Sequence, residues 1–313
     1  MSAAPPTAAS SAPAASPPPD WRRRRTPAGV PYALIVPALA LYALIVLYPT
    51  ISGAVYAFTD WRGQAAGTSF IGWDNFTRMF SDVAARAALG NTVLIAVVVT
   101  AVQTVLGLAL AIALHSALIT RNVLRTLFFA PALLPPVVIA FLWQFILTPS
   151  GPLNTVLRGI GLDALAQNWL GDSSIALWTV MGVMIWQNVG MSMVIYLAGL
   201  QGIPGELIES ASLDGATWWQ RLRMITVPLL IPATTVVMSL ILISSLKVFD
   251  QVFAMTGGGP GYSTETLSVI MYKEAFVSGR FGYAAAIALV LTMIVFAFAM
   301  VQLAALRRFE VDR

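Results

Sequence analysis

Long apolar runs alternate with short polar segments along most of the chain. Because the hydrocarbon core of a bilayer is about 30 Å thick, a helix needs roughly 20 predominantly apolar residues to cross it. Six runs reach that length, at approximately 32–58, 90–116, 124–147, 174–200, 228–250 and 282–306. The pattern therefore predicts an all-α membrane protein with six transmembrane helices.

The third run is interrupted by three prolines, Pro131, Pro135 and Pro136. Proline removes a backbone donor and kinks a helix, so neighbouring helices or water must satisfy the freed carbonyl groups inside a membrane. We expect a kinked helix at this position.

The composition supports a membrane protein and excludes several kinds of chemistry. The 313 residues are 58% hydrophobic and 10% charged, with a mean hydropathy of +0.79, which leaves too little polar surface for a soluble globule. The chain has no cysteine and a single histidine, His115, so it has no disulfide, no thiolate nucleophile and no multi-His metal site. The net charge is only +4, which does not indicate nucleic-acid binding.

The N-terminal segment differs from the rest of the chain. Residues 1–27 are rich in Ala, Pro and Ser and are predicted to be a disordered cytoplasmic tail, whereas 28–313 are predicted to form the transmembrane domain. The apolar core of a cleaved signal peptide has about 7–15 residues. The run at 32–58 is much longer, so we expect it to be an uncleaved first span.

The distribution of basic residues predicts the orientation, because cytoplasmic segments of membrane proteins carry an excess of Lys and Arg. With the N-terminus inside, eleven basic residues are cytoplasmic: Arg22–Arg25, Arg121, Arg125, Arg221, Arg223, Arg307, Arg308 and Arg313. Six are outside: Arg62, Arg78, Arg86, Arg158, Lys273 and Arg280. Six spans with both termini in the cytoplasm agree with this bias.

A charged segment at about 204–226 interrupts the apolar pattern between the fourth and fifth runs. Pro204 suits a first helical position, and Glu206 and Glu209 favour the positive end of a helix. Asp214-Gly215 predicts the end of that helix, because glycine adopts a left-handed conformation at little cost. Thr217 can cap a second helix that Pro228 closes. The segment therefore has the form of a cytoplasmic docking element.

This segment resembles the cytoplasmic signature of permease subunits of binding-protein-dependent ABC importers. The signature reads Glu-Ala-Ala, three residues, Gly, nine residues, Ile, one residue, Leu-Pro. The chain matches it with Glu209-Ser210-Ala211, Gly215, Ile225 and Val227-Pro228, where Ser210 replaces alanine and Val227 replaces leucine. In such importers the signature forms a coupling helix seated in a cleft of a cytoplasmic ATPase subunit. The resemblance implies ATPase-coupling roles for Glu209, Ser210, Ala211, Asp214, Gly215, Ile225 and Pro228.

Other segments are similar to the carbohydrate branch of that family, the maltose-type and glycerol-phosphate-type permeases. They are "FIGWDNF", "LAGLQGIPGELIESASLDGA", "FDQVFAMTGGGPGYSTETL" and "FGYAAAIALVLTMIVF". The similarity covers roughly 30–310 and implies a MetI-like transmembrane fold preceded by one extra helix.

Two polar stripes are candidates for a substrate pathway. Asn188, Ser192 and Tyr196 follow an i, i+4, i+8 spacing in the fourth run. Ser244, Lys247 and Gln251 share a face in the fifth run, with Asp250 beside it. Intramembrane charges are costly and usually face a cavity or a partner. The alternatives are hydrogen bonding between helices and, for Lys247, a position at the outer interface.

The resemblance implies a non-catalytic permease subunit of an importer for a sugar or sugar derivative in a bacterial cell membrane. Its implied partners are a second permease, two cytoplasmic ATPase subunits, an extracytoplasmic solute-binding protein, membrane lipid and the sugar, without nucleic acid. The chain needs no cofactor of its own: "TGGGPG" lacks the Gly-Lys-Ser/Thr of a Walker A motif, so ATP and Mg²⁺ are expected on the ATPase subunits.

Two other classes of protein remain as alternatives. A stand-alone secondary transporter or channel for a small polar solute would be expected to carry intramembrane carboxylates, for which Asp250 is the sole candidate. A membrane enzyme would need paired acids, a metal cluster or an activated nucleophile, and the sequence shows none of these.

Overall fold

The computed structural model describes residues 35–63, 67–115 and 119–307. The predicted tail and its boundary lie outside these residues. The chain divides into two units, 1–51 and 52–313. The first unit contributes α1 (Ile35–Tyr42), a π-helical turn (Ala43–Leu47) and the start of α2 (Tyr48–Tyr56). With the rest of α2 they form the helix Ile35–Tyr56, whose 22 residues are long and apolar enough to cross a membrane.

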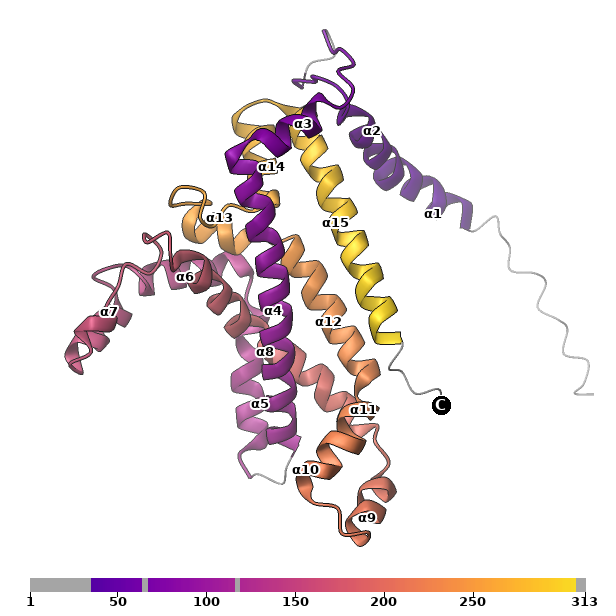
Figure 1. Cartoon of the computed structure of the whole chain (residues 1–313), viewed down its shortest axis with the longest axis vertical. Coiled ribbons are helices and arrows are strands. Elements are labelled where there is room, and N and C mark those ends of the chain that lie inside the picture. Colours follow the sequence, from indigo (N-terminus) through magenta and orange to yellow (C-terminus); the bar gives the residue numbers. More distant parts are fainter. Residues whose placement is uncertain (1–34, 64–66, 116–118, 308–313) are drawn as a thin grey trace, which may run out of the picture. The chain divides into compact units, whose positions relative to one another are not determined.

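Four long helices organise the second unit (Figure 1): α4 (Val83–His115), α8 (Ala176–Gln201), α12 (Ile231–Leu246) and α15 (Phe281–Arg307). Helix α4 packs against α8 and α12, and α12 also packs against α15. Helix α4 begins seven residues before the predicted span, because the Asp82 carboxylate accepts a hydrogen bond from Ala84 N at 2.9 Å and caps it.

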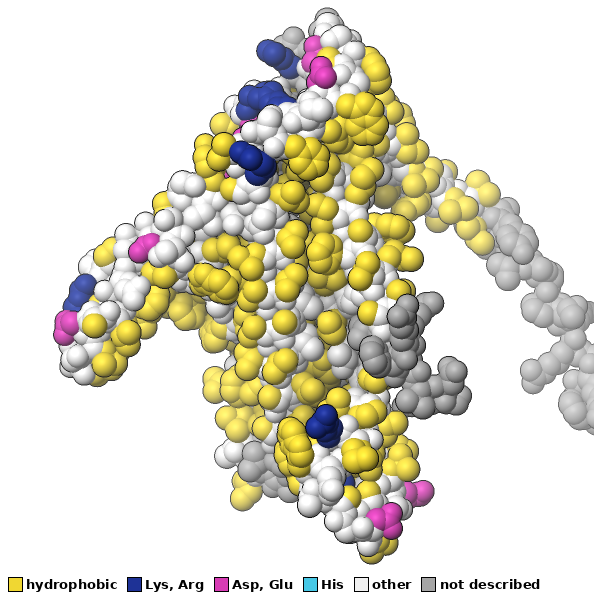
Figure 2. All heavy atoms as spheres, in the orientation of Figure 1, with side chains coloured by type: hydrophobic (Ala, Val, Ile, Leu, Met, Phe, Trp, Pro, Cys, Tyr) yellow, Lys and Arg dark blue, Asp and Glu magenta, His cyan; other side chains and the backbone are white. Residues whose placement is uncertain are grey.

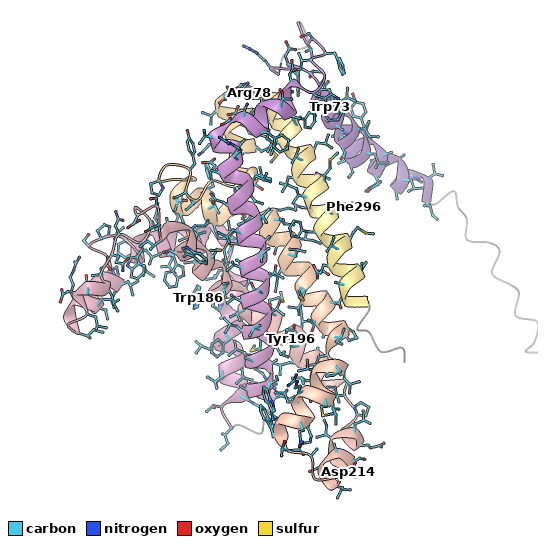
Figure 3. All side chains as sticks on the ribbon, viewed as in Figure 1. Trp73, Arg78, Trp186, Tyr196, Asp214 and Phe296 are labelled. Carbon is cyan, nitrogen blue, oxygen red and sulfur yellow. The ribbon has the colours of Figure 1, made fainter. Side chains whose placement is uncertain are left out.

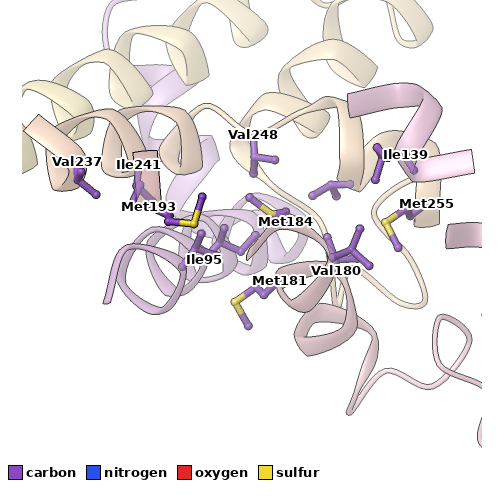
Figure 4. Packing of buried hydrophobic residues seen from close by; sticks show 14 of the residues in the cluster. Ile95, Ile139, Val180, Met181, Met184, Met193, Val237, Ile241, Val248 and Met255 are labelled. Atoms are coloured by element: carbon purple, nitrogen blue, oxygen red, sulfur yellow. The ribbon is translucent and has the colours of Figure 1, made fainter. Parts of the chain in front are cut away.

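The core of the second unit lies where α4, α8 and α12 meet. Ile95, Met184, Met193, Val237 and Ile241 pack together there (Figure 4). Lipid tails are as apolar as these side chains, so the hydrophobic effect contributes little to the association of helices in a membrane. Close approach of the helix backbones contributes more. Gly107 allows this approach, because a Cβ on it would lie 2.6 Å from Ser192 Cβ.

The third predicted span is broken rather than simply kinked. Helix α5 (Arg121–Phe129) continues into a 3₁₀ turn (Ala130–Leu133), and α6 (Pro136–Ile146) then leaves at an angle of 100°. The interruption predicted at the prolines is confirmed, and the two helices could together form one broken span. The break leaves the Leu134 carbonyl without a helical donor, and Gln187 Nε2 donates to it at 3.1 Å.

The fifth predicted span, 228–250, also differs from the structure. Helix α10 (Trp218–Arg221), a π-helical turn (Leu222–Thr226) and α11 (Val227–Leu229) form one continuous segment, which is bent by 65° from α12. Pro228 does not close the second docking helix as predicted. The widened π turn before it relieves the clash between its ring and the preceding carbonyl groups. Helix α12 ends at Leu246, and α13 (Asp250–Thr256) begins after a three-residue break.

Shorter helices complete the second unit: α3 (Asp74–Ser81), α7 (Pro152–Gly159), a 3₁₀ turn (Asp163–Leu165), α14 (Leu267–Tyr272) and a π-helical turn (Lys273–Val277). On the face shown in Figure 2, hydrophobic side chains cover the middle of this unit and charged side chains lie towards its ends and on α7. Among the described residues, four helices could each cross a membrane. The number rises to as many as six if α5 with α6, and the segment Trp218–Leu229 with α12, each form one bent span.

Candidate functional site

The docking segment is a helix-turn-helix, as predicted. Helix α9 (Gly205–Leu213) ends at Asp214, and Gly215 adopts φ +80°. The amide of Ala216 donates to the carbonyl of Ala211 at 2.9 Å, and Gly215 N donates to Ser212 O at 3.1 Å. These two hydrogen bonds form a Schellman motif, which satisfies the carbonyl groups at the end of a helix. Pro204 is the N-cap residue rather than the first helical residue as predicted.

Thr217 starts the second docking helix with a capping box. Its backbone N donates to Gln220 Oε1 at 2.7 Å, and its hydroxyl accepts from Gln220 N at 3.4 Å. Reciprocal bonds of this kind satisfy two orphan donors at the beginning of a helix. The segment is therefore held by its own local hydrogen bonds.

The docking segment presents a mixed surface. Of the seven predicted coupling residues, Glu209, Ser210, Asp214 and Gly215 are exposed, and Ala211, Ile225 and Pro228 are half-buried. Figure 3 shows Asp214 at the tip of the segment. Leu213 beside it is 89% exposed. Glu209 also borders a cavity of about 490 Å³ with His115 and Arg221.

A cavity of about 450 Å³ lies between α4, α8 and the break between α12 and α13. Its lining is mixed, and we call it the polar cavity because eight of its eighteen lining residues are polar or charged. Six of the seven predicted pathway residues line it: Asn188, Ser192, Ser244, Lys247, Asp250 and Gln251. The structure thus brings residues of both polar stripes together. The arrangement of the second stripe, however, differs from the prediction. Ser244, Lys247 and Gln251 do not share one helical face, because the helix stops at Leu246.

Tyr196 does not belong to this cavity. It is 0% exposed and belongs to the apolar core, in the middle of the bundle (Figure 3). On a helix with 3.6 residues per turn, residue i+8 is rotated about 80° from residue i. Asn188 and Ser192 therefore reach the cavity, whereas Tyr196 points into the packed interior.

Some of the polar side chains that line the cavity also form hydrogen bonds between helices. Gln103 Nε2 on α4 donates to Ser192 Oγ at 2.9 Å and to Asn188 O at 3.1 Å. Gln251 Nε2 donates to Gln187 Oε1 at 3.2 Å. Asn188 differs, because its Nδ2 donates only within its own helix, to Met184 O at 3.0 Å. Gln103 and Ser245 are polar lining residues that the sequence did not single out. Gln103 is an isolated amide in an apolar run.

Lys247 and Asp250 are both exposed at this cavity. In the described part of the chain, no salt bridge joins them, and the ion pairs found there involve other residues. A structural role for Lys247 as the partner of Asp250 is therefore not seen. Both charges are available to water or to a polar ligand.

The loop after α13 is held by groups that the sequence did not single out. Lys273 Nζ contacts Glu265 Oε2 at 2.7 Å, and Glu265 is 1% exposed. Asn91 Nδ2 on α4 donates to Tyr262 O at 3.0 Å and to Glu265 O at 2.9 Å. Nearby, the hydrogen bond from Arg280 to Glu274 raises the pKa of the arginine, which keeps it charged. This loop is therefore a defined structure.

Membrane-length helices around a polar cavity, with a separate charged docking segment, define the membrane-spanning part of a transport system. The family described as the binding-protein-dependent transport system inner membrane component matches residues 103–309, and the chain belongs to this family. The resemblance found in the docking segment is thereby confirmed.

Similar proteins agree with this assignment. The chain is 39% identical to the probable ABC transporter permease protein YurN of Bacillus subtilis, over 88% of this chain and 94% of that protein. It is 34% identical to the multiple sugar-binding transport system permease protein MsmF of Streptococcus mutans, over 89% and 95%.

A solved structure is also similar. It is a bacterial alginate ABC transporter in complex with its alginate pentasaccharide-bound periplasmic protein, with 26% identity, a TM-score of 0.78, and coverage of 89% of this chain and 94% of that one. The predicted MetI-like, all-α membrane fold is confirmed. The chain is a membrane-embedded permease subunit of an ABC importer.

Proposed function

We propose that this permease subunit forms, with a second permease, the pathway for a sugar or sugar derivative. The polar cavity carries this proposal. A sugar that leaves water must exchange its hydrogen bonds, and each unpaired hydroxyl costs about 1–3 kcal/mol in a dry site. Amide, hydroxyl, ammonium and carboxylate groups converge there, from Asn188, Ser244, Lys247 and Asp250. The names of MsmF and of the alginate transporter support the same substrate class.

The docking segment supports the proposed coupling to ATP hydrolysis. It projects an exposed helix end with acidic and apolar side chains, which suits insertion into a cleft on a partner. In this proposal two cytoplasmic ATPase subunits bind there, and they hold ATP and Mg²⁺ while this chain itself is not catalytic. An extracytoplasmic solute-binding protein delivers the sugar.

The proposed location follows from the distribution of arginines. We place the protein in a bacterial cell membrane with both termini and the docking segment in the cytoplasm. The loop after α13 then lies on the outer side, where a solute-binding protein docks.

Affinity purification from native membranes tests this proposal. We expect a tag on this chain to recover a second permease and an ATPase, and the solute-binding protein loaded with sugar to stimulate ATP hydrolysis by the recovered complex. A chain that is recovered alone and transports a solute in liposomes without ATP would instead be a stand-alone transporter.

A further inference from the structure

Three amide side chains line the polar cavity: Gln103, Asn188 and Gln251. The nitrogen of each donates a hydrogen bond to an oxygen of the protein. The side-chain oxygen of each accepts no hydrogen bond within the described part of the chain. These oxygens are not among the buried atoms that lack a partner, so each reaches the accessible surface. All three are therefore available to a molecule in the cavity.

Backbone carbonyl groups fix the direction of two of these amides. Gln103 Nε2 lies 3.1 Å from Asn188 O, and Asn188 Nδ2 lies 3.0 Å from Met184 O. Turning either amide over would bring its oxygen against a carbonyl oxygen, and neither of those atoms carries a hydrogen to donate. The oxygen is therefore the end of both side chains that stays without a protein partner.

The break in the third span fixes the third amide through two successive hydrogen bonds. The Leu134 carbonyl accepts from Gln187 Nε2 at 3.1 Å, which leaves the oxygen of Gln187 to face another donor. That oxygen accepts from Gln251 Nε2 at 3.2 Å. A Gln251 amide turned over would place two oxygens against each other, so its own oxygen is again the end without a partner.

The serines of the cavity add few free donors. The Ser244 hydroxyl donates to Ile241 O at 2.9 Å, so its lone pairs rather than its hydrogen remain free. Ser192 and Ser245 are only 2% and 1% exposed. Acceptor oxygens therefore dominate the uncharged polar surface of the cavity.

The charged side chains do not favour an anion either. Among the described lining residues, Lys247 is the one cation and Asp250 the one anion, so their formal charges cancel. Both are exposed. A carboxylate in the cavity would be attracted by Lys247, but it would be repelled by Asp250 and would face the amide oxygens without a hydrogen to donate to them.

We propose that the polar cavity selects neutral sugars over sugar acids, because it binds the hydrogens of sugar hydroxyl groups through its acceptor oxygens. A hydroxyl group can donate to these oxygens, whereas an ionised carboxylate only accepts. The hydrogen bond from Gln187 to Leu134 O contributes to this selectivity, because it sets the direction of the Gln251 amide. This inference rests on the proposed function of the polar cavity and narrows its substrate class.

Protection of a single cysteine by matched sugars tests this selectivity in the assembled importer, since the natural chain has no cysteine. Leu240→Cys is the reporter, because Leu240 lines the polar cavity and is 55% exposed. Ser278→Cys is the control, because Ser278 is exposed and does not line the cavity. The probes are glucose with glucuronate, galactose with galacturonate, and mannose with mannuronate. Within each pair a CH₂OH group is replaced by a carboxylate.

We expect each neutral sugar to slow thiol labelling of Leu240→Cys by half at a concentration about tenfold lower than its acid does, since one badly paired group changes affinity by about that factor. No probe should protect Ser278→Cys. Equal or stronger protection by the acids would overturn this inference and leave the proposed function intact. Protection by none of the probes would overturn the proposed function as well.

Two variants test the groups that carry the selectivity. Asp250→Asn keeps the shape of the side chain and leaves the cavity with the positive charge of Lys247. Gln187→Met removes the acceptor that holds the Gln251 amide, so that its NH₂ group can turn towards the cavity. We expect both variants to shift the ratio of half-protecting concentrations several-fold in favour of the acid.

Matched controls separate this effect from a general disturbance. Asp163→Asn removes an exposed carboxylate and Gln144→Met removes an amide of α6, and neither side chain lines the polar cavity. Both should keep the ratio of the unmodified importer. The ratio is read from importer recovered with the second permease, and Asp250→Asn decides alone if Gln187→Met is not recovered. An unchanged ratio in Asp250→Asn would overturn the inference.

Discussion

Gly257 and Gly258, which follow α13, have the same left-handed backbone but different surroundings. Their φ angles are +60° and +91°. A Cβ on Gly257 meets nothing within 4 Å, whereas a Cβ on Gly258 collides with the Glu265 carboxylate and lies 3.1 Å from Lys273 Nζ. The sequence shows only a cluster of glycines, but the structure shows that Gly258 leaves space for the buried Glu265 carboxylate, which pairs with the half-buried Lys273.

This pair of glycines allows a matched prediction. A left-handed backbone costs other residues about 1–2 kcal/mol, so Gly257→Ala is expected to lower stability by about that amount. Gly258→Ala has the same cost of a left-handed backbone, and its methyl group also displaces Glu265, which is 1% exposed. We expect a larger decrease in the thermal midpoint of the purified importer for Gly258→Ala, and equal midpoints would contradict the role assigned to the ion pair.

The polar cavity gives a second prediction at the residue scale. Asn188→Leu is expected to reduce sugar uptake with normal assembly, because its side chain bonds only within α8. Lys247→Ala should do the same, without rescue on removal of Asp250, since the two form no ion pair. Gln251→Leu also removes the bond to Gln187 and should affect stability as well.

Gln144→Leu is the control for these cavity variants. Gln144 is an amide in α6 that lines a separate cavity of about 370 Å³ with Thr256 and Gly259. Normal uptake and unchanged sugar preference in the three cavity variants would place the pathway lining elsewhere, such as on the second permease.

At the scale of elements, the broken third span depends on one side chain from α8. Gln187 is 1% exposed, and it donates to the carbonyl of Leu134, which the break in the helix leaves without a helical donor. Gln187→Leu keeps the volume but leaves that carbonyl unsatisfied, at a cost of about 1–3 kcal/mol. It also removes the acceptor for Gln251 Nε2. We expect the midpoint of thermal unfolding of the importer to fall. An unchanged midpoint would show that water donates to the Leu134 carbonyl in place of the amide.

The turn between α9 and α10 gives a second test at this scale. Gly215 has φ +80° and Gly205 does not have a positive φ, and a Cβ meets nothing within 4 Å at either position. Gly215→Ala is therefore expected to disturb the Schellman turn by about 1–2 kcal/mol and to reduce uptake and sugar-stimulated ATP hydrolysis, with normal insertion. Gly205→Ala is expected to change neither, and equal activity of the two variants would argue against a role of the turn in coupling.

Elements that depend on local sequence were predictable, and breaks that depend on neighbours were not. The apolar runs gave the long helices, and Asp214-Gly215 and Thr217 gave the docking turn, because caps and turns act within a few residues. The break at 247–249 carries no proline or glycine, so no local signal marks it. The bonds from Gln103 to Ser192 and from Lys273 to Glu265 join separate helices or turns, whose packing the sequence alone does not specify.

At the scale of the whole molecule, orientation links the docking segment to its proposed partners. Helix α9 and helix α14 lie at opposite ends of the second unit (Figure 1). If the docking segment meets ATPase subunits, it must lie in the cytoplasm, and the turn before α15 must then lie outside. The excess of basic residues in the inner segments favours this orientation.

Single cysteines in this cysteine-free chain test the orientation directly. Ser212→Cys, in α9, and Ser278→Cys, before α15, replace exposed serines of similar size. In intact cells we expect a membrane-impermeant thiol reagent to label position 278 at once and position 212 only after the membrane is permeabilised. The reverse pattern would place the docking segment outside, where no ATP-hydrolysing partner can reach it, and the proposed coupling would then be wrong whatever sugar the polar cavity binds.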